Sequence, residues 1–297
     1  MILITGASGF LGKSILDFFS SKDISILSLG RNSLNDIKCD LSSEIPNLNL
    51  TEIELVIHAA GKAHSIPKNQ LEINRFFEVN VIGTQNLLKG LALAGVPKQF
   101  VFISSVAVYG LNEGNKINEN SPLLAIDPYG LSKIQAERVV IDWCYKNNVV
   151  CTILRLPLLV GKNPPGNFGA MIKAIHKGYY FNIGGGKAIK SMVLAEDVVR
   201  FIPIIASVGG IYNLTDGEHP NFMYISNAIA KKRMYNLPLL IAKIMGYLGD
   251  CIGEKAPINS LKIKKITTNL AFDDSKARRL GWKSQSVLEY LKNNDLL

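Results

Sequence analysis

Short continuous apolar runs alternate with longer stretches of helical periodicity through the first 160 residues. Continuous apolar runs indicate strands covered on both faces, and helices between them indicate parallel βαβ units with right-handed crossovers. The pattern therefore predicts an α/β fold with a doubly wound parallel sheet, whose ligand lies at the carboxyl ends of the strands. The expected strands are residues 1–5, 24–29, 54–59, 99–104 and 149–154, and the expected helices are residues 10–21, 71–94 and 129–147.

The pattern changes after residue 160, where turn-forming residues become frequent. Residues 161–166 read Gly-Lys-Asn-Pro-Pro-Gly and residues 184–186 are three glycines, and both compositions are typical of loops. We expect residues 161–297 to form mainly a smaller C-terminal lobe over the strand ends, with one return to the sheet near residues 210–214. Residues 1–160 would then form the sheet domain.

The longest apolar stretch, residues 237–252, is interrupted by Pro238, Lys243 and Asp250. A membrane-spanning helix needs about 20 mostly apolar residues. We therefore predict a buried amphipathic helix here. Transient contact with a membrane surface is the alternative. The chain starts without a basic leader, and its four cysteines form no CxxC pair that would indicate a disulfide framework or a metal site. We expect a cytoplasmic protein without an integral membrane segment.

The chain is basic, with a formal net charge of +9 and 47% hydrophobic residues among 297. This hydrophobic content excludes a disordered chain and is typical of a soluble globular protein. Basic proteins bind nucleic acids, acidic membranes or phosphorylated small molecules. The densest basic clusters, residues 231–233 and 262–265, are not interleaved with aromatic residues. We therefore expect an anionic small ligand and no nucleic acid.

A glycine-rich loop directly follows the first predicted strand and opens the first predicted helix. It reads Gly6-Ala7-Ser8-Gly9-Phe10-Leu11-Gly12. Gly6 permits the tight turn, Gly9 lets the backbone approach a pyrophosphate, and Gly12 lets the helix pack close to the sheet. The free N–H groups at the start of the helix then bind phosphate. The loop therefore predicts a dinucleotide site.

With the preceding Thr5, this loop resembles the TGxxGFxG loop of the extended short-chain dehydrogenase/reductases, the NAD-dependent epimerase/dehydratase family. The resemblance covers nearly the whole chain. It implies a dinucleotide-binding Rossmann domain over residues 1–160 and a lobe over residues 161–297 that binds mainly the substrate. The loop residues that it assigns to the cofactor are Gly6, Ser8, Gly9, Phe10, Leu11 and Gly12.

The end of the second strand bears on the choice of cofactor. It reads Ser28-Leu29-Gly30-Arg31, without the Asp or Glu that grips the ribose 2′-hydroxyl of NAD. Arg31 can instead pair with a 2′-phosphate. We therefore favour NADP(H) as the cofactor and keep NAD(H) open. The resemblance also implies that Asp40 and Leu41 touch the adenine.

Two further segments resemble parts of the family's cofactor site. His58-Ala59-Ala60, after the strand at 54–59, resembles the HxAA segment that lies beside the cofactor. Its small residues would let the cofactor lie against the backbone, and we expect His58 to be a structural hydrogen bonder rather than a catalyst. Asn80 matches the family's helix asparagine that supports the site.

Tyr129 and Lys133 stand four residues apart at the start of a predicted helix, so they share one helix face. Asp127 can cap this helix and Pro128 suits its first turn. A free tyrosine has a pKa of about 10, and a nearby ammonium favours the phenolate. We therefore expect Lys133 to lower the pKa of Tyr129. The resemblance implies that both residues are catalytic together with Ser105, and that both also contact the cofactor.

The residues after Ser105 exclude one reaction of the family. Its sugar-nucleotide 4,6-dehydratases carry an Asp-Glu pair at this place, whereas Val106 and Ala107 stand here and cannot act as acid or base. A dehydratase is therefore not expected. What remains is oxidation or reduction at a carbinol, by a reductase, a dehydrogenase or an epimerase.

The resemblance assigns the remaining site residues. Residues 155–161 resemble the RxxxVYGP segment whose backbone lies against the nicotinamide, and Lys190 stands where relatives have a phosphate-binding Arg. His64 is a candidate for a sugar contact, weighed against a plain surface histidine. The residues assigned to the cofactor in this way are Ser104, Pro157 and Leu158, and those assigned to the substrate are Ser105, Val106, Tyr129, Asn167, Phe168 and Lys190.

Within the family, the chain most resembles the group that reduces 4-keto sugars on UDP in bacterial surface-polysaccharide pathways. We therefore expect a UDP-4-keto-6-deoxy-N-acetylhexosamine 4-reductase. A UDP-hexose 4-epimerase with tightly held NAD is the alternative. A non-catalytic dinucleotide-sensing protein is the alternative of another class, and it has no need for Ser105, Tyr129 and Lys133. A homodimer through residues 71–94 and 129–147 stays open.

Overall fold

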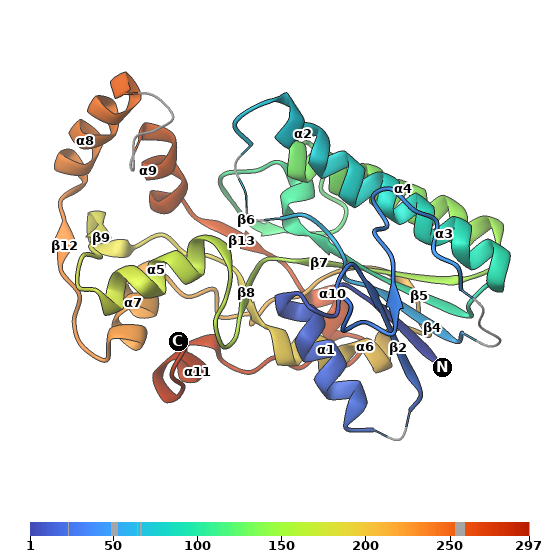
Figure 1. Cartoon of the computed structure of the whole chain (residues 1–297). Helices are drawn as coiled ribbons and strands as arrows, with labels where there is room; N and C mark the ends of the chain where they lie inside the picture. The colour runs from blue at the N-terminus through green and yellow to red at the C-terminus, as the bar shows by residue number, and fades with distance from the viewer. Residues whose placement is uncertain (23, 49–52, 64, 66, 253–258, 297) are drawn as a thin grey trace.

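Seven parallel strands form the central sheet of the protein, in the order β11-β7-β5-β4-β1-β2-β3 (Figure 1). The computed structural model describes residues 1–22, 24–48, 53–63, 65, 67–252 and 259–296. The predicted doubly wound parallel sheet is confirmed, because the strand order reverses direction beside β1. The strands are β1 (Ile2–Thr5), β2 (Ile26–Gly30), β3 (Ile37–Lys38), β4 (Leu55–His58), β5 (Gln99–Ser105), β7 (Val150–Leu156) and β11 (Gly210–Asn213).

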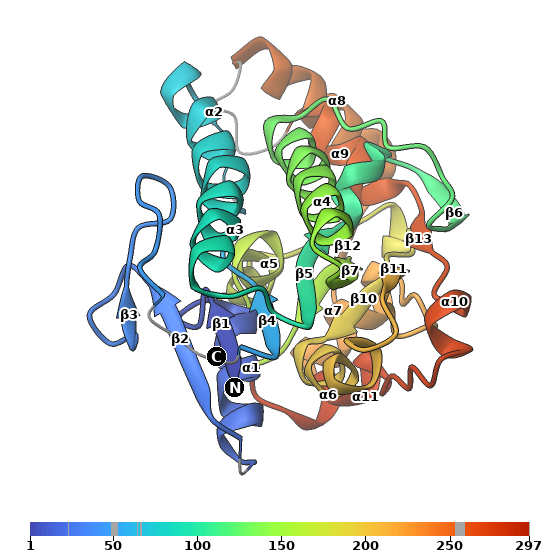
Figure 2. The same cartoon turned by 90° about the vertical axis from the view of Figure 1, so that its right-hand side faces the viewer.

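Helices cover both faces of this sheet, which explains why its strands are apolar at successive positions. Side chains of a strand alternate between faces. Ile4 of β1 therefore belongs to the core under α1 (Phe10–Ser20) and α6 (Ala195–Ile205), whereas Leu3 belongs to the core under α3 (Gly83–Ala94) and α4 (Pro128–Lys146). Figure 2 shows α3 and α4 on one side of the sheet and α1 and α6 on the other.

The long helix expected over residues 71–94 contains an irregular turn. It consists of α2 (Gln70–Phe77), a π-helical turn (Glu78–Ile82) and α3. The sequence pattern predicts the extent of this helix but not its interruption. Single π-turns are frequent at functional sites, and this one carries Asn80, which is buried.

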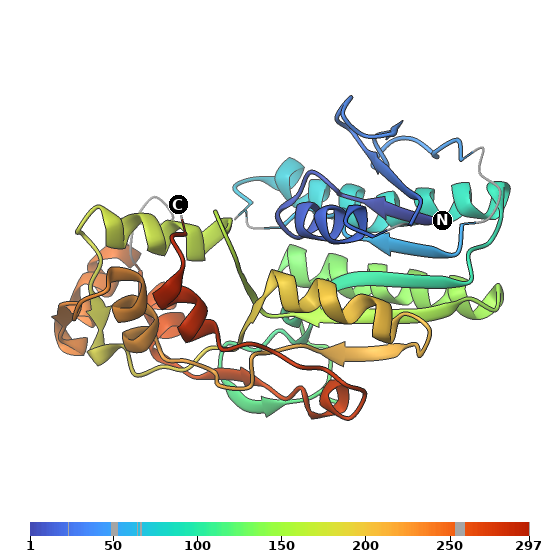
Figure 3. The same ribbon diagram turned by 90° about the horizontal axis from the view of Figure 1, so that it is seen from below.

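Much of the chain after residue 160 packs around a core of its own, beside the sheet (Figure 3). This C-terminal lobe contains α5 (Gly166–His176), α7 (Phe222–Ala230) and α11 (Val287–Asn293), and it meets the paired strands β8 (Leu158–Val160) and β10 (Met192–Leu194). After α6, which packs against α1, the chain returns to the sheet at β11, within residues 210–214. The remaining elements are β6 (Gly114–Ile117), β9 (Asn182–Ile183), β12 (Asn236–Leu237), α8 (Leu239–Ile252), α9 (Ser260–Thr267), β13 (Leu270–Phe272), α10 (Ser275–Arg278) and the 3-10 turns Val106–Tyr109 and Gly184–Gly186.

Helix α8 corrects one expectation from the sequence. Residues 237–252 are predicted to be a buried amphipathic helix, but most large apolar side chains of α8 are exposed, and the buried residues are Ala242, Gly246 and Gly249. The prediction of a helix is right and the prediction of its burial is wrong, because α8 packs through its small residues. Among the described residues, no helix is long and apolar enough to cross a membrane.

Candidate active site

The glycine-rich loop has the geometry that its sequence predicts. Gly6 has a φ of +73°, and a Cβ at this position would lie 2.6 Å from the backbone nitrogen of Ala60. A Cβ on Gly12 would lie 2.0 Å from the carbonyl oxygen of Gly6, so α1 can pack this closely only with glycine there. The loop therefore turns tightly between β1 and α1 and lies against the end of β4.

The start of α1 suits an anion such as a diphosphate. Its N-cap is Gly9, which supplies no side-chain hydrogen bond to the helix, and the first turn contains no acidic residue. The first N–H groups of a helix have no partner within the helix and carry the positive end of its dipole. Ser8 and Gly9 are exposed beside them. These residues fit the diphosphate of a dinucleotide.

Tyr129 lies in the first turn of α4, where the local sequence fixes it. The Asp127 carboxylate accepts a hydrogen bond from the Gly130 backbone nitrogen at 3.0 Å, and Pro128 opens the helix. Ser105, at the end of β5, hydrogen-bonds with the Tyr129 side chain. The Ser105 Oγ also accepts a hydrogen bond from the Ala107 backbone nitrogen at 3.1 Å, which leaves its own proton for the tyrosine oxygen.

Lys133 does not lower the pKa of Tyr129 in the structure, contrary to the expectation from the sequence. Burial raises the pKa of Tyr129, and the group that lowers it is Ser105. Lys133 donates to the carbonyl oxygen of Ile103 at 2.8 Å, and its Nζ lies 4.6 Å from the centre of the Phe102 ring. Burial lowers the pKa of Lys133 to about 8. The ammonium is therefore held by the strand beneath it instead of acting on the phenol.

His58 connects the glycine loop with the helix that follows. The Ala60 backbone nitrogen donates to the Thr5 hydroxyl, which lies 2.6 Å from His58 Nδ1. On the other side of the ring, Nε2 lies 2.9 Å from the Thr84 hydroxyl, which donates to the Asn80 carbonyl oxygen. Because the Thr84 proton is already committed, Nε2 carries the ring proton. Burial lowers the pKa of His58 to about 3, so the ring stays neutral as a structural link.

Asn80 ties the segment after β4 to the helix of Tyr129. Its Oδ1 accepts from the Lys62 backbone nitrogen at 2.7 Å, and its Nδ2 donates to the Ser132 hydroxyl at 2.8 Å. Ser132 in turn donates to the Tyr129 carbonyl oxygen at 2.8 Å. A Cβ on Gly61 would lie 3.3 Å from Lys133 Nζ, so this segment passes close to the lysine. The loop, His58, Asn80, Tyr129, Lys133 and Ser105 thus form one connected group at the carboxyl ends of β1, β4 and β5.

A buried ion pair beneath this group is absent from the sequence-based predictions. Glu137 lies one turn after Lys133 on α4, and its carboxylate binds the Arg155 guanidinium at 2.7 Å. Ser104 donates to Glu137 at 2.5 Å, and Arg155 also donates to the Tyr109 hydroxyl at 3.1 Å. Glu137 acts against the effect of burial on the pKa of Lys133. One feature of the sequence could have indicated this buried pair. Glu137 is a carboxylate four residues after Lys133, and it shares the buried face of α4 with Val140 and Cys144.

The residues expected around the adenosine lie beyond β2. Arg31 is exposed directly after that strand. The pKa of Asp40 is lowered, chiefly by the hydrogen bond from the Ser42 hydroxyl and to a smaller extent by the charge of Arg31. The Asp40 carboxylate accepts hydrogen bonds from the backbone and hydroxyl of Ser42, at 3.1 and 2.6 Å. Leu41 is buried, and its carbonyl oxygen accepts from Asn86.

The structure does not bring the other predicted residues into the hydrogen-bonded group around Tyr129. Asn167 is exposed on the lobe, and Phe168 is part of the core of the lobe. Lys190 is half-buried, and burial together with the charge of Lys265 lowers its pKa to about 8. His64 lies outside the described residues. Partly exposed positions are occupied by Ala59, Val106, Pro157 and Leu158.

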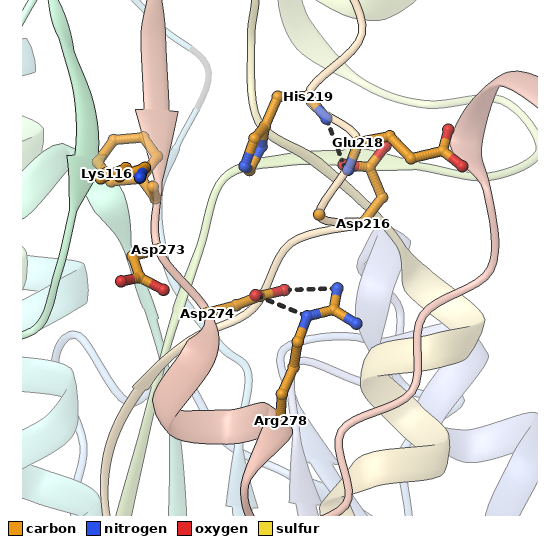
Figure 4. Close-up of a pocket in the computed structure, with 9 residues that line it drawn as sticks. Lys116, Asp216, Glu218, His219, Asp273, Asp274 and Arg278 are labelled. Atoms are coloured by element: carbon orange, nitrogen blue, oxygen red, sulfur yellow. Dashed lines mark hydrogen bonds and ion pairs between the residues drawn. The ribbon is translucent and has the colours of Figure 1, made fainter.

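A hollow of about 520 Å³ lies elsewhere, between β13 and the segment after β11 (Figure 4). Within it, Asp274 binds the Arg278 guanidinium at 2.8 and 2.9 Å, and Asp216 Oδ1 accepts from two backbone nitrogens. Asp216 Oδ2 is buried and has no hydrogen-bond partner among the described residues. Neither Tyr129 nor Lys133 lines this hollow. The residues that line it are Lys116, Asp216, Gly217, Glu218, His219, Phe272, Asp273, Asp274 and Arg278.

Asp216→Asn is expected to stabilise the protein at pH 8 and to change its stability little at pH 4. Burial raises the pKa of Asp216 to about 7, whereas an unfolded Asp has a pKa of about 3.9. The folded state therefore binds the proton more tightly, and this contribution to stability is lost as pH rises toward and through 7. The variant should gain about 2 to 4 kcal/mol in free energy of unfolding at pH 8 by urea denaturation. An equal change at both pH values would contradict the assignment.

Known proteins of one enzyme family are similar to this chain. The model of the NAD dependent epimerase/dehydratase family matches residues 2–214. The N-acetyl-alpha-D-glucosaminyl-diphospho-ditrans,octacis-undecaprenol 4-epimerase of Escherichia coli O157:H7 is 29% identical, over 97% of this chain and 91% of that protein. The UDP-glucose 4-epimerase of Vibrio cholerae is 28% identical, over 97% and 92%.

Among solved structures, MoeE5 in complex with UDP-glucose and NAD superposes with a TM-score of 0.76. The match covers 98% of this chain and 95% of that chain at 22% sequence identity, which supports the fold alone. The family match spans the sheet, the glycine loop and the Tyr129 helix. The resemblance stated from the sequence is confirmed, and the chain belongs to the NAD dependent epimerase/dehydratase family.

Proposed function

We propose that the protein is a nicotinamide-dependent oxidoreductase that acts on a hydroxyl or ketone of a UDP-linked sugar. The observation that carries this proposal is the group formed by Ser105, Tyr129 and Lys133 beside the glycine loop, where the start of α1 fits a diphosphate. The relative named as a UDP-glucose 4-epimerase supports the choice of substrate class.

The residues of this group supply acid–base chemistry at a carbonyl. A bound reduced nicotinamide would supply the hydride. Tyr129 would donate its phenolic proton to the ketone oxygen, and Ser105 would hold that oxygen beside the phenol. Because burial raises the pKa of Tyr129, the phenol is protonated at neutral pH, which is the state that a reduction requires. Lys133, which the Ile103 carbonyl oxygen holds in place, would hold the nicotinamide ribose.

The more specific proposal is reduction of a UDP-4-keto-6-deoxy-N-acetylhexosamine at carbon 4, with NADP(H) as cofactor. The two carboxylates that follow β2 are both engaged by serines: Asp36 by Ser28 at 2.8 and 2.7 Å, and Asp40 by Ser42. Arg31 remains exposed at the strand end, where it would meet a 2′-phosphate. A cofactor that is released and replaced suits a reductase.

A 4-epimerase is the second candidate, because the relatives at 29% and 28% identity are named as 4-epimerases of a lipid-linked or UDP-linked sugar. An epimerase would use the same residues and return its cofactor to the starting state in each cycle. The two candidates therefore differ in cofactor use. The test is a panel of UDP-sugars and UDP-4-keto-sugars with NADH and NADPH, read by absorbance and product analysis. One cofactor oxidised per product supports the reductase, and product without net oxidation supports the epimerase; no turnover of any sugar would contradict both.

Arg31→Ala is expected to weaken NADPH binding about tenfold or more and NADH binding much less. The reason is loss of a charge-assisted bond to the 2′-phosphate, worth about 1.5 to 3 kcal/mol. Fluorescence titration of both cofactors measures the two dissociation constants. Lys13, on α1 and also exposed, provides the control variant Lys13→Ala. Equal losses for the two cofactors would overturn the preference for NADP(H).

A further inference from the structure

Helix α8 packs in an unusual way for a helix of a globular protein. Its buried residues are small, Ala242, Gly246 and Gly249, and they lie on one face. A Cβ on Gly246 would lie 2.5 Å from Ile263 Cδ1, so α9 packs tightly against this face. A helix of a globular protein usually buries its large apolar side chains, whereas α8 buries small residues and exposes the large apolar ones.

The large apolar side chains of α8 consequently face away from the protein. Leu240 and Tyr247 are each 71% exposed, and Ile244 and Leu248 are more than half exposed. Single exposed apolar residues are ordinary, but a contiguous set on one helix indicates a contact surface. We call this set the α8 face; it consists of Leu239, Leu240, Ile241, Ile244, Met245, Tyr247, Leu248 and Ile252.

The charged residues of α8 and α9 are mostly positive. The described residues of α8 and α9 carry four lysines, Lys243, Lys262, Lys264 and Lys265, and one acid, Asp250. Asp250 accepts a hydrogen bond from the Ser260 backbone nitrogen at the start of α9. An apolar face with a cationic surround is complementary to a surface that offers both acyl chains and anionic headgroups.

We propose that the α8 face docks on an anionic lipid surface, with α8 lying in the plane of the interface. At 14 residues the helix is shorter than the roughly 20 needed to span a bilayer, so it lies on the membrane and does not cross it. A second copy of the chain fits the face less well, because pairing would bring two sets of lysines together. Figure 1 shows α8 and α9 at the end of the lobe far from the N-terminus.

The test is sedimentation of the whole protein with vesicles of phosphatidylglycerol and phosphatidylcholine, compared with phosphatidylcholine alone. The triple variant Leu240→Gln, Ile244→Gln and Leu248→Gln removes apolar area, and Lys264→Gln with Lys265→Gln removes charge. The matched control is Leu93→Gln on α3, which changes a leucine that is 83% exposed outside the α8 face. Circular dichroism checks that each variant is folded, and light scattering measures its oligomeric state.

The wild type is expected to bind the anionic vesicles and to bind phosphatidylcholine more weakly. The triple variant should bind the anionic vesicles at least about tenfold more weakly, and the lysine variant should lose most of its preference for them. The control should bind like the wild type. Wild type that fails to bind anionic vesicles at low salt, or binds them as the triple variant does, would overturn the proposal. A wild-type dimer that the triple variant splits, without vesicle binding, would assign the α8 face to a second copy instead.

Discussion

Tyr129→Phe is expected to lower turnover by roughly two to four orders of magnitude while dinucleotide binding changes little. The substitution removes the proposed proton donor to the ketone oxygen, and it leaves the aromatic ring against Phe76. The glycine loop and the start of α1, which fit the diphosphate, do not involve the hydroxyl. Steady-state kinetics with the sugar that the panel identifies measures turnover, and fluorescence titration measures cofactor binding.

A matched control is available on the same helix. Tyr145 of α4 is 85% exposed, so Tyr145→Phe removes a hydroxyl without touching the site. The control should keep wild-type turnover. Turnover of Tyr129→Phe within threefold of the wild type would remove Tyr129 from the proton transfer and with it the proposed mechanism.

Arg155→Met is expected to lower the free energy of unfolding by about 3 to 5 kcal/mol. The side chains of Arg155 and Glu137 are only 3% and 2% exposed. Removal of the guanidinium leaves the Glu137 carboxylate buried with Ser104 as its remaining hydrogen-bond donor. An unpaired buried charge costs more than the pair contributes. Urea denaturation followed by tryptophan fluorescence measures the loss.

The double variant Glu137→Leu with Arg155→Met distinguishes the contribution of the ion pair from the cost of leaving one charge buried without its partner. It removes both charges, so it should be more stable than Arg155→Met alone. The exposed ion pair between Lys98 and Glu54, at 2.7 Å, gives the comparison, and Lys98→Met should change the stability far less than Arg155→Met does. Additive losses in the double variant would show that the buried pair is not coupled.

The sequence predicts the sheet and the glycine loop well because both depend on local patterns. Apolar runs in the strands alternate with helical periodicity, and Gly6 and Gly12 occupy places where a Cβ would collide with backbone. The helix face shared by Tyr129 and Lys133 also follows from spacing alone, since residues four apart lie together on any helix.

The features that the sequence does not predict depend on contacts between distant segments. The partner of Glu137 is Arg155, which β7 brings beneath α4. The pKa of Tyr129 is raised because burial outweighs the hydrogen bond from Ser105, and Lys133 is held by Ile103. Periodicity likewise shows that residues 237–252 form a helix but not which face packs, and this face is decided by the close approach of α9 at Gly246.

The most direct test of the account is a crystal structure of the protein with bound NADPH. We expect the diphosphate at the start of α1 against Gly9, the 2′-phosphate beside Arg31, and the nicotinamide next to the Tyr129 hydroxyl. A diphosphate bound elsewhere, or a nicotinamide out of reach of both Tyr129 and Ser105, would contradict the proposed chemistry.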